Sequence, residues 1–175
     1  MEHEYWLDIG AGMDAEHWAS TAAPERVRRV AIDPLLTSGM VQSGRLAPLP
    51  PDIFRIGAEI RPVRSVEHDK QRAYLPFRDA VFQHVHCGFM LHLYLETLEV
   101  LVTEAHRVLL PGGTFQVLVP HFGDGHSESI LFHTEAALRK TFPEVRLEHF
   151  QGPFTTFWAD LYRDRTYSLC CRKGY

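Results

Sequence analysis

Short apolar runs alternate with breaks rich in glycine and proline along the whole chain. Apolar runs of a few residues that end at such breaks are typical of β-strands. We therefore expect strands at Tyr5–Ile9, Val27–Asp33, Val63–Glu67, Ala80–Cys87, Thr114–Val119, Val145–His149 and Tyr167–Cys171. Helix-like spacing predicts helices at Asp14–Ala22, Asp52–Ile60, Leu93–Leu109 and Thr134–Thr141. Strands that alternate with helices indicate an α/β fold.

Residues that cap or break helices support these boundaries. Asp14 is a suitable N-cap for the first helix, and Thr134, followed by Glu135, for the last. Pro51 stands before the short helix predicted at Asp52–Ile60, where proline fits well. The breakers Pro111-Gly112-Gly113 are expected to stop the helix that precedes them.

The stretch Tyr5–Asp14 has the pattern of a buried strand, a glycine turn and the start of a helix. Glycine tolerates positive φ and lets a ligand approach bare backbone, while a helix N-terminus offers free N–H groups to an anion. Gly10, Gly12 and Ala15 also match the dinucleotide pattern G-x-G-x-x-G/A, and Asp33 follows at a distance suited to a ribose. This spacing alone leaves the ligand open between a nicotinamide cofactor and another nucleoside.

Companion motifs narrow that choice. Asp8 lies two residues before Gly10, Leu75-Pro76-Phe77 leads into the fourth predicted strand, and the segment Arg107–Pro120 reads RVLLPGGTFQVLVP. In this order the motifs resemble the class I S-adenosylmethionine-dependent methyltransferases, especially their small-substrate branch. The resemblance extends from Tyr5 to Lys173.

The resemblance implies a Rossmann-like three-layer α/β sandwich. Its seven-stranded, mostly parallel sheet has the order 3-2-1-4-5-7-6, with the last strand antiparallel. The chain begins almost at its first strand, so we expect it to lack the N-terminal helices that usually roof the pocket in this family. The irregular stretch Leu36–Arg61, the loop after the fifth strand, or a partner chain would then form the cover.

The same resemblance assigns S-adenosylmethionine as the cofactor and names the residues that would bind it. Asp8, Gly10, Ala11 and Gly12 would meet its methionine end. Asp33 would accept both ribose hydroxyls, with Pro34 and Leu35 beside it near the adenine. Gln71 and Ala73 are candidates for the adenine edge, and Cys87 and Gly88 would run beneath the cofactor. Asp33 could alternatively be only a turn-forming residue before Pro34.

Two positions depart from the family pattern. Asp14 stands where a third glycine is usual, and Gln83 where the fourth strand often carries an acid. Both departures put the strength of cofactor binding in question.

Candidate catalytic residues follow the fourth and fifth strands. His92 occupies a position where the resembled family often has a histidine between cofactor and substrate, although a packing role is equally consistent. His121 and Asp124, with His126, lie in the loop after the fifth strand, at the edge of the sheet where open α/β folds bind ligands. A histidine there could accept a proton from an O or N nucleophile.

The chain carries eleven histidines, but they favour no metal site. His84 and His86 share one strand face, yet no HExxH motif, paired CxxC motif or carboxylate cluster accompanies the histidines. We therefore expect no metal.

Composition bounds the remaining possibilities. The 175 residues, 45% of them apolar, suit a single domain over residues 1–175. The net charge of −4 disfavours a nucleic-acid partner. No apolar run is long enough for a membrane span, and neighbouring Cys170 and Cys171 point to opposite strand faces, which favours reduced thiols in the cytoplasm.

These observations predict a methyltransferase that acts on an O, N or C nucleophile of a small molecule. A non-catalytic or partner-activating subunit of a methyltransferase complex is the main alternative. An RNA methyltransferase and a nicotinamide-dependent oxidoreductase are weaker ones. A homodimer or a partner chain could cover the open site.

Overall fold

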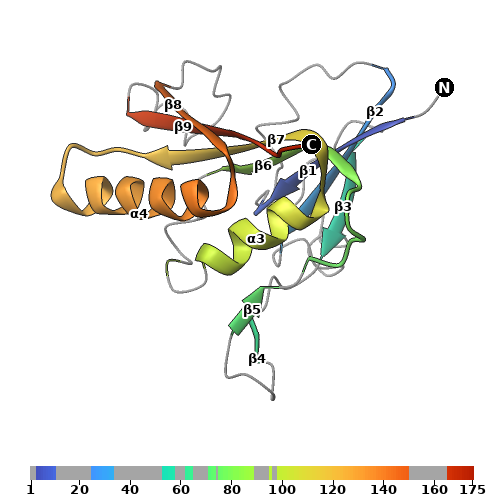
Figure 1. Ribbon diagram of the computed structural model, residues 1–175, viewed down its shortest axis with the longest axis horizontal. Helices are drawn as coiled ribbons and strands as arrows, with labels where there is room; N and C mark the ends of the chain where they lie inside the picture. Colours follow the sequence, from blue (N-terminus) through green and yellow to red (C-terminus); the bar gives the residue numbers. More distant parts are fainter. Residues whose placement is uncertain are drawn as a thin grey trace, which may run out of the picture.

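The computed structural model describes residues 3–10, 25–33, 53–57, 62–64, 71–73, 75–88, 95, 98–149 and 165–175. Seven strands form one sheet in the order β3-β2-β1-β6-β7-β9-β8 (Figure 1). The strands are β1 (Glu4–Ile9), β2 (Val27–Asp33), β3 (Ile53–Gly57), β6 (Phe82–Gly88), β7 (Leu109–Pro120), β8 (Glu144–His149) and β9 (Thr166–Arg172). β9 runs antiparallel to both of its neighbours, β7 and β8, and all the other neighbouring pairs are parallel. The predicted order and the antiparallel strand near one edge are confirmed.

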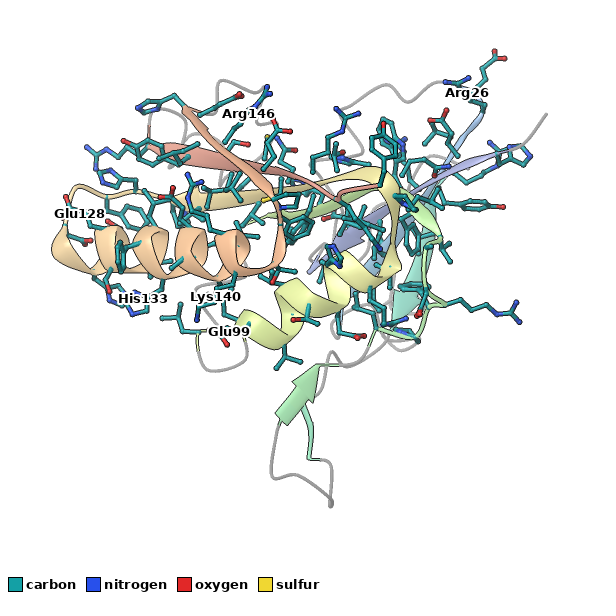
Figure 2. The ribbon with its side chains drawn as sticks, in the orientation of Figure 1. Arg26, Glu99, Glu128, His133, Lys140 and Arg146 are labelled. Atoms are coloured by element: carbon teal, nitrogen blue, oxygen red, sulfur yellow. The ribbon has the colours of Figure 1, made fainter. Side chains whose placement is uncertain are left out.

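Two helices, α3 (Leu98–Val108) and α4 (Gly125–Thr141), cover the same face of this sheet (Figure 1). Strand residues that alternate along the chain bury their side chains against these helices. The buried cluster comprises, among others, Leu7, Ile9, Val85, Cys87, Phe115, Val117, Val119 and Leu169 from the sheet and Leu101, Ala105, Ile130 and Leu138 from the helices. An ion pair between Lys140 of α4 and Glu99 of α3 joins the two helices at the surface (Figure 2).

Two predicted elements between β2 and β6 are wrong. Ile53–Gly57 forms β3, paired with Arg29–Asp33, where a short helix was expected. Val63–Glu67 is not the third strand of the sheet, because β4 (Pro62–Arg64) pairs with β5 (Gln71–Ala73) in a separate two-stranded sheet. A short apolar run fits a strand or a helix, and here pairing along the edge of β2 decides the outcome.

The start of the last helix also differs from the prediction. Asp124 is the N-cap of α4, and its carboxylate accepts a hydrogen bond from the Ser127 N–H at 2.7 Å. Thr134 lies inside this helix, where its hydroxyl donates to the carbonyl of Ile130. The helix is therefore longer than expected, because it begins with Gly125–Ser129, which carry no apolar side chain to show a helical period.

The connection between α3 and the next strand is shorter than the motif Pro111-Gly112-Gly113 predicted. The helix ends at Val108, and β7 begins at Leu109 and runs through Pro111-Gly112-Gly113 into the predicted fifth strand. The predicted helix at Asp14–Ala22 lies outside the described residues. Within the described part of the chain, the helices are too short or too polar to cross a membrane.

Candidate active site

The carboxyl ends of β1, β2 and β6 meet at the centre of the sheet. The chain places β2 on one side of β1 and β6 on the other, so the strand order reverses at β1. Ligands of open α/β sheets bind in the crevice outside such a reversal point. Asp8 is the second-last residue of β1 and Gly10 follows that strand directly, while Asp33 ends β2 and Gly88 ends β6. The residues predicted from separate motifs therefore gather at one edge.

Gly10 makes the turn that follows β1. Its φ is 71°, in the left-handed region that side chains other than glycine rarely adopt. Its N–H donates to the carbonyl of Ile32 at 2.9 Å, which ties the turn to the end of β2. This bond fixes the spacing between the ends of β1 and β2.

Asp8 is buried, with 3% of its surface exposed. In the sheet register it lies between Ala31 of β2 and His86 of β6. Its side chain faces away from α3 and α4, because the neighbouring residues Leu7 and Ile9 belong to the core on the helix side. A buried carboxylate at this point suits a cationic or hydrogen-bond-donating ligand group.

Cys87 directs its side chain into the core, so only its backbone can contact a ligand at the edge. Burial, reinforced by the nearby charge of Asp8, raises the pKa of the Cys87 thiol far above its usual range. The thiol is therefore neutral and is not a nucleophile.

Gly88 is the last residue of β6, and a β-carbon at this position would be crowded. A Cβ added to Gly88 would lie 3.0 Å from Nε2 of His86. The His86 imidazole thus reaches along the strand over Gly88, toward the edge where the cofactor residues gather.

The backbone of Asp33 ends β2 and pairs with Gly57 of β3. Gln71 and Ala73 lie instead on β5, in the small sheet that projects beyond α3 (Figure 1). Their role at the adenine remains a prediction. The predicted site residues Ala11, Gly12, Pro34, Leu35 and His92, and the departure at Asp14, lie outside the described residues.

His121 begins the loop after β7. Its N–H donates to the carbonyl of Arg165 at 2.6 Å, and its ring lies perpendicular to that of Tyr167 with centroids 5.1 Å apart. The Tyr167 ring also lies 4.7 Å from that of His149. These three rings lie close together at the carboxyl end of β7.

Asp124 is held by the helix that it caps. Hydrogen bonds from Ser127 lower the pKa of the Asp124 carboxyl, and the charges of His126 and His121 lower it further. A carboxylate with a lowered pKa is a poor general base. Capping of α4 accounts for its position and its ionised state.

Gln83 lies at the opposite end of β6. Its side-chain oxygen accepts the N–H of Tyr5 at 2.6 Å, near the amino end of β1. The departure at Gln83 is therefore remote from the carboxyl ends where the cofactor residues lie.

The motif Leu75-Pro76-Phe77 is held by two side chains of α3 that sequence reasoning missed. The Arg107 guanidinium donates to both carboxylate oxygens of Glu104 at 2.8 Å, and also to the carbonyls of Leu75 and Phe77. Glu104 in turn accepts the N–H of Leu75 at 2.9 Å. This clamp positions the chain that leads into β6. The i, i+3 spacing of Glu104 and Arg107 was the available signal.

Comparisons with known proteins agree with this geometry. Residues 7–117 match the family described as "Methyltransferase domain". The chain belongs to this methyltransferase family. No curated protein matches the sequence significantly.

Solved methyltransferases share the fold. A 16S rRNA (adenine(1408)-N(1))-methyltransferase from Catenulisporales acidiphilia, with SAM as cosubstrate, aligns with a TM-score of 0.66 at 14% identity, over 99% of this chain and 87% of that one. An S-adenosylmethionine-dependent methyltransferase from Mesorhizobium loti aligns with a TM-score of 0.60 at 18% identity, over 98% of this chain and 92% of that one. A third match is a chain from the complex between the Haloferax volcanii Trm112 methyltransferase activator and a protein provisionally described as a methyltransferase. It aligns with a TM-score of 0.64 at 18% identity, over 99% of this chain and 84% of that one.

These findings confirm the predicted class I fold and S-adenosylmethionine as the cofactor of the family to which the chain belongs. They also set aside the nicotinamide-dependent oxidoreductase. Among the described residues, no three His, Cys, Asp or Glu side chains are arranged to hold a metal ion.

Proposed function

We propose that this protein is an S-adenosylmethionine-dependent methyltransferase that methylates an O, N or C nucleophile of a small molecule. The observation that carries the proposal is the meeting of Asp8, Gly10, Asp33 and Gly88 at the carboxyl ends of three adjacent parallel strands. All four lie within the part of the chain that matches the methyltransferase family.

The donor and acceptor groups at this edge fit the cofactor. The methionine end carries an ammonium group, for which the buried Asp8 supplies a carboxylate. The ribose presents two hydroxyl donors, and a carboxylate such as that of Asp33 can accept both. The positive φ of Gly10 favours glycine at this position, and a glycine carries no side chain to block the path of the cofactor.

When bound, S-adenosylmethionine supplies a methyl group on a positively charged sulfur that is already reactive toward nucleophiles. The protein then has to hold the acceptor in line and keep water out. Because His121 lies at the carboxyl end of β7, we assign it as the residue that would accept a proton from the acceptor. His92 remains a second candidate. Asp124 is not needed for this step, since its carboxylate caps α4.

A non-catalytic or partner-activating subunit remains the main alternative. One reason for it was Gln83, but this residue contacts the amino end of β1 and is remote from the proposed site. A second reason, Asp14, lies outside the described residues. The third reason was the expected lack of N-terminal helices over the pocket, which remains a prediction that favours this alternative. The match to a complex with a methyltransferase activator supports a related proposal, in which a partner chain covers the site of an active enzyme.

An RNA acceptor has one specific observation in its favour, because one structural neighbour is an rRNA methyltransferase. The net charge of −4 argues against it, since RNA binding relies on positive surfaces. A small-molecule acceptor is therefore the better proposal.

Transfer of a labelled methyl group tests this function. The purified protein is incubated with methyl-labelled S-adenosylmethionine and separate pools of small metabolites, total RNA and protein. Label in the small-molecule pool, lost in a His121→Ala variant that still binds the cofactor, supports the proposal. Label only in RNA would replace the acceptor class. Tight cofactor binding with no labelled product in any pool would favour the non-catalytic subunit.

A further inference from the structure

A row of polar side chains crosses the sheet on the face opposite α3 and α4. Asp8 of β1, His86 of β6, Gln116 of β7 and Cys170 of β9 are successive neighbours in the strand register. Asp8 and His86 are 3% and 1% exposed. Buried polar residues in the middle of a sheet need hydrogen-bond partners.

Hydrogen bonds orient the His86 ring within this row. Its Nδ1 lies 3.3 Å from the side-chain oxygen of Gln116, whose amide nitrogen donates to the Ser168 hydroxyl at 3.1 Å. The Gln116 oxygen is then the acceptor, so Nδ1 of His86 carries the hydrogen. The ring is thereby held from the side of β7 and β9.

The other side of the ring faces the proposed cofactor site. Nε2 of His86 would lie 3.0 Å from a Cβ on Gly88, which shows that the imidazole occupies the space over this glycine. Asp8 lies opposite His86 on the same face, and neighbouring strands are separated by about 4.8 Å. His86 therefore adjoins two of the residues assigned to the cofactor, one on each strand.

We propose that His86, held by Gln116, is a positioning residue for the methionine end of the cofactor. It fixes the Asp8 carboxylate and the backbone at Gly88 in the arrangement that binds the amino-acid group. Its effect should therefore depend on that group and not on the adenosine. This inference rests on the proposed function.

The test compares two ligands that differ at the methionine end. S-adenosylhomocysteine carries the ammonium and carboxylate, whereas 5′-methylthioadenosine has the same nucleoside without them. Calorimetry measures the affinity of each ligand for the wild-type protein and for a His86→Phe variant. The variant keeps a ring over Gly88 but loses both nitrogens. We expect a loss of roughly tenfold or more in affinity for S-adenosylhomocysteine, and less than about twofold for methylthioadenosine.

His84 provides a matched control. It lies on the same strand and the same face, and its Nδ1 contacts the Thr114 hydroxyl at 2.7 Å. It is two residues nearer the amino end of β6, opposite Trp6. A His84→Phe variant should bind both ligands as the wild type does.

A second variant, Gln116→Leu, keeps the imidazole and removes its anchor. It should show the same selective loss, smaller in size, and it carries the test if thermal unfolding shows that His86→Phe does not fold. Equal loss of both ligands, or unchanged binding of S-adenosylhomocysteine, would overturn the positioning role. A wild-type protein that binds neither ligand would instead refute the proposed function.

Discussion

The side chains of Arg107 and Glu104 together hold four atoms of the chain that enters the central strand β6. Arg107 contacts the carbonyls of Leu75 and Phe77 and the carboxylate of Asp79, at 2.7 to 3.1 Å. Both oxygens of Glu104 accept from this guanidinium, and one also accepts the Leu75 N–H. The motif LPFRD and the motif EAHRV are thus two halves of one interaction between distant parts of the sequence.

Replacing Arg107 with leucine should lower the free energy of unfolding by about 2–4 kcal/mol, because the partly buried Glu104 and two carbonyls lose their donor. Urea unfolding followed by circular dichroism measures the change. Arg139 is the control, since it also pairs with a glutamate, Glu135, but is 55% exposed. Arg139→Leu should change stability by less than about 1 kcal/mol. Equal effects of the two variants would show that the clamp contributes little.

Gly113 lies where the backbone of β7 passes close to β6. A Cβ at this position would lie 2.9 Å from the carbonyl oxygen of Leu110 and 3.0 Å from that of Gln83. Gly113→Ala should therefore destabilise the protein by about 1–3 kcal/mol. At Gly125, the first residue of α4, a Cβ meets nothing within 4 Å, so Gly125→Ala should be neutral or slightly stabilising. Thermal unfolding of both variants measures the difference. Equal midpoint temperatures for the two variants would contradict this account.

Asp124 should stabilise the protein in a pH-dependent way. Its pKa in the folded state is lowered by the hydrogen bonds from Ser127, so its contribution is present above the pKa of the unfolded chain. The contribution is lost as the pH falls through the lowered folded pKa, in strongly acidic solution. The stability difference between wild type and Asp124→Ala should accordingly shrink on acidification. Asp124→Ser should retain part of the cap and, because capping needs no charge, most of the methyl-transfer activity. If a folded Asp124→Ser variant had no activity, Asp124 would again be a candidate catalytic residue.

Asp33 should contribute to cofactor affinity. We predict that Asp33→Ala weakens binding of S-adenosylmethionine by about 1–3 kcal/mol, the usual loss when a charged hydrogen-bonding partner is removed. Isothermal calorimetry measures this change, with the exposed Glu128→Ala on α4 as the control (Figure 2). Unchanged affinity would remove Asp33 from the site and leave it as a turn residue.

Most of the sheet was predictable because each strand carries its own signal. Val27–Asp33 was predicted with its observed bounds, and Val145–His149 and Tyr167–Cys171 lie within one residue of the observed ends. The order of the strands followed from the family resemblance, since apolar runs alone do not reveal which strands are neighbours.

The failures have a common physical cause. Ile53–Gly57 reads IFRIG, in which Arg55 interrupts the apolar residues, and it is the pairing with β2 that makes it a strand. The first turns of α4 read GHSESILF, with too few apolar residues to show a helical period, although Asp124 and Ser127 have the spacing of a cap. Local sequence does not specify contacts made with distant strands or solvent-facing turns.

The residues of the candidate site also fall into two groups: those that sequence motifs mark, and those that only the fold brings together. Asp8, Gly10, Asp33 and Gly88 were predicted because motifs mark them, and the structure places them at the carboxyl ends of neighbouring strands. His86 was noted only as a partner of His84 on a strand face. Its position over Gly88 and opposite Asp8 depends on the register between β1 and β6, which the sequence does not encode locally.

A crystal of the protein soaked with S-adenosylhomocysteine tests the central claim most directly. We predict electron density over the carboxyl ends of β1 and β2, with the ribose at Asp33 and the amino-acid end beside Asp8 and Gly10. Density for the ligand elsewhere, or a crevice filled by the protein's own side chains with no space for adenosine, would contradict the assignment of this edge as the cofactor site.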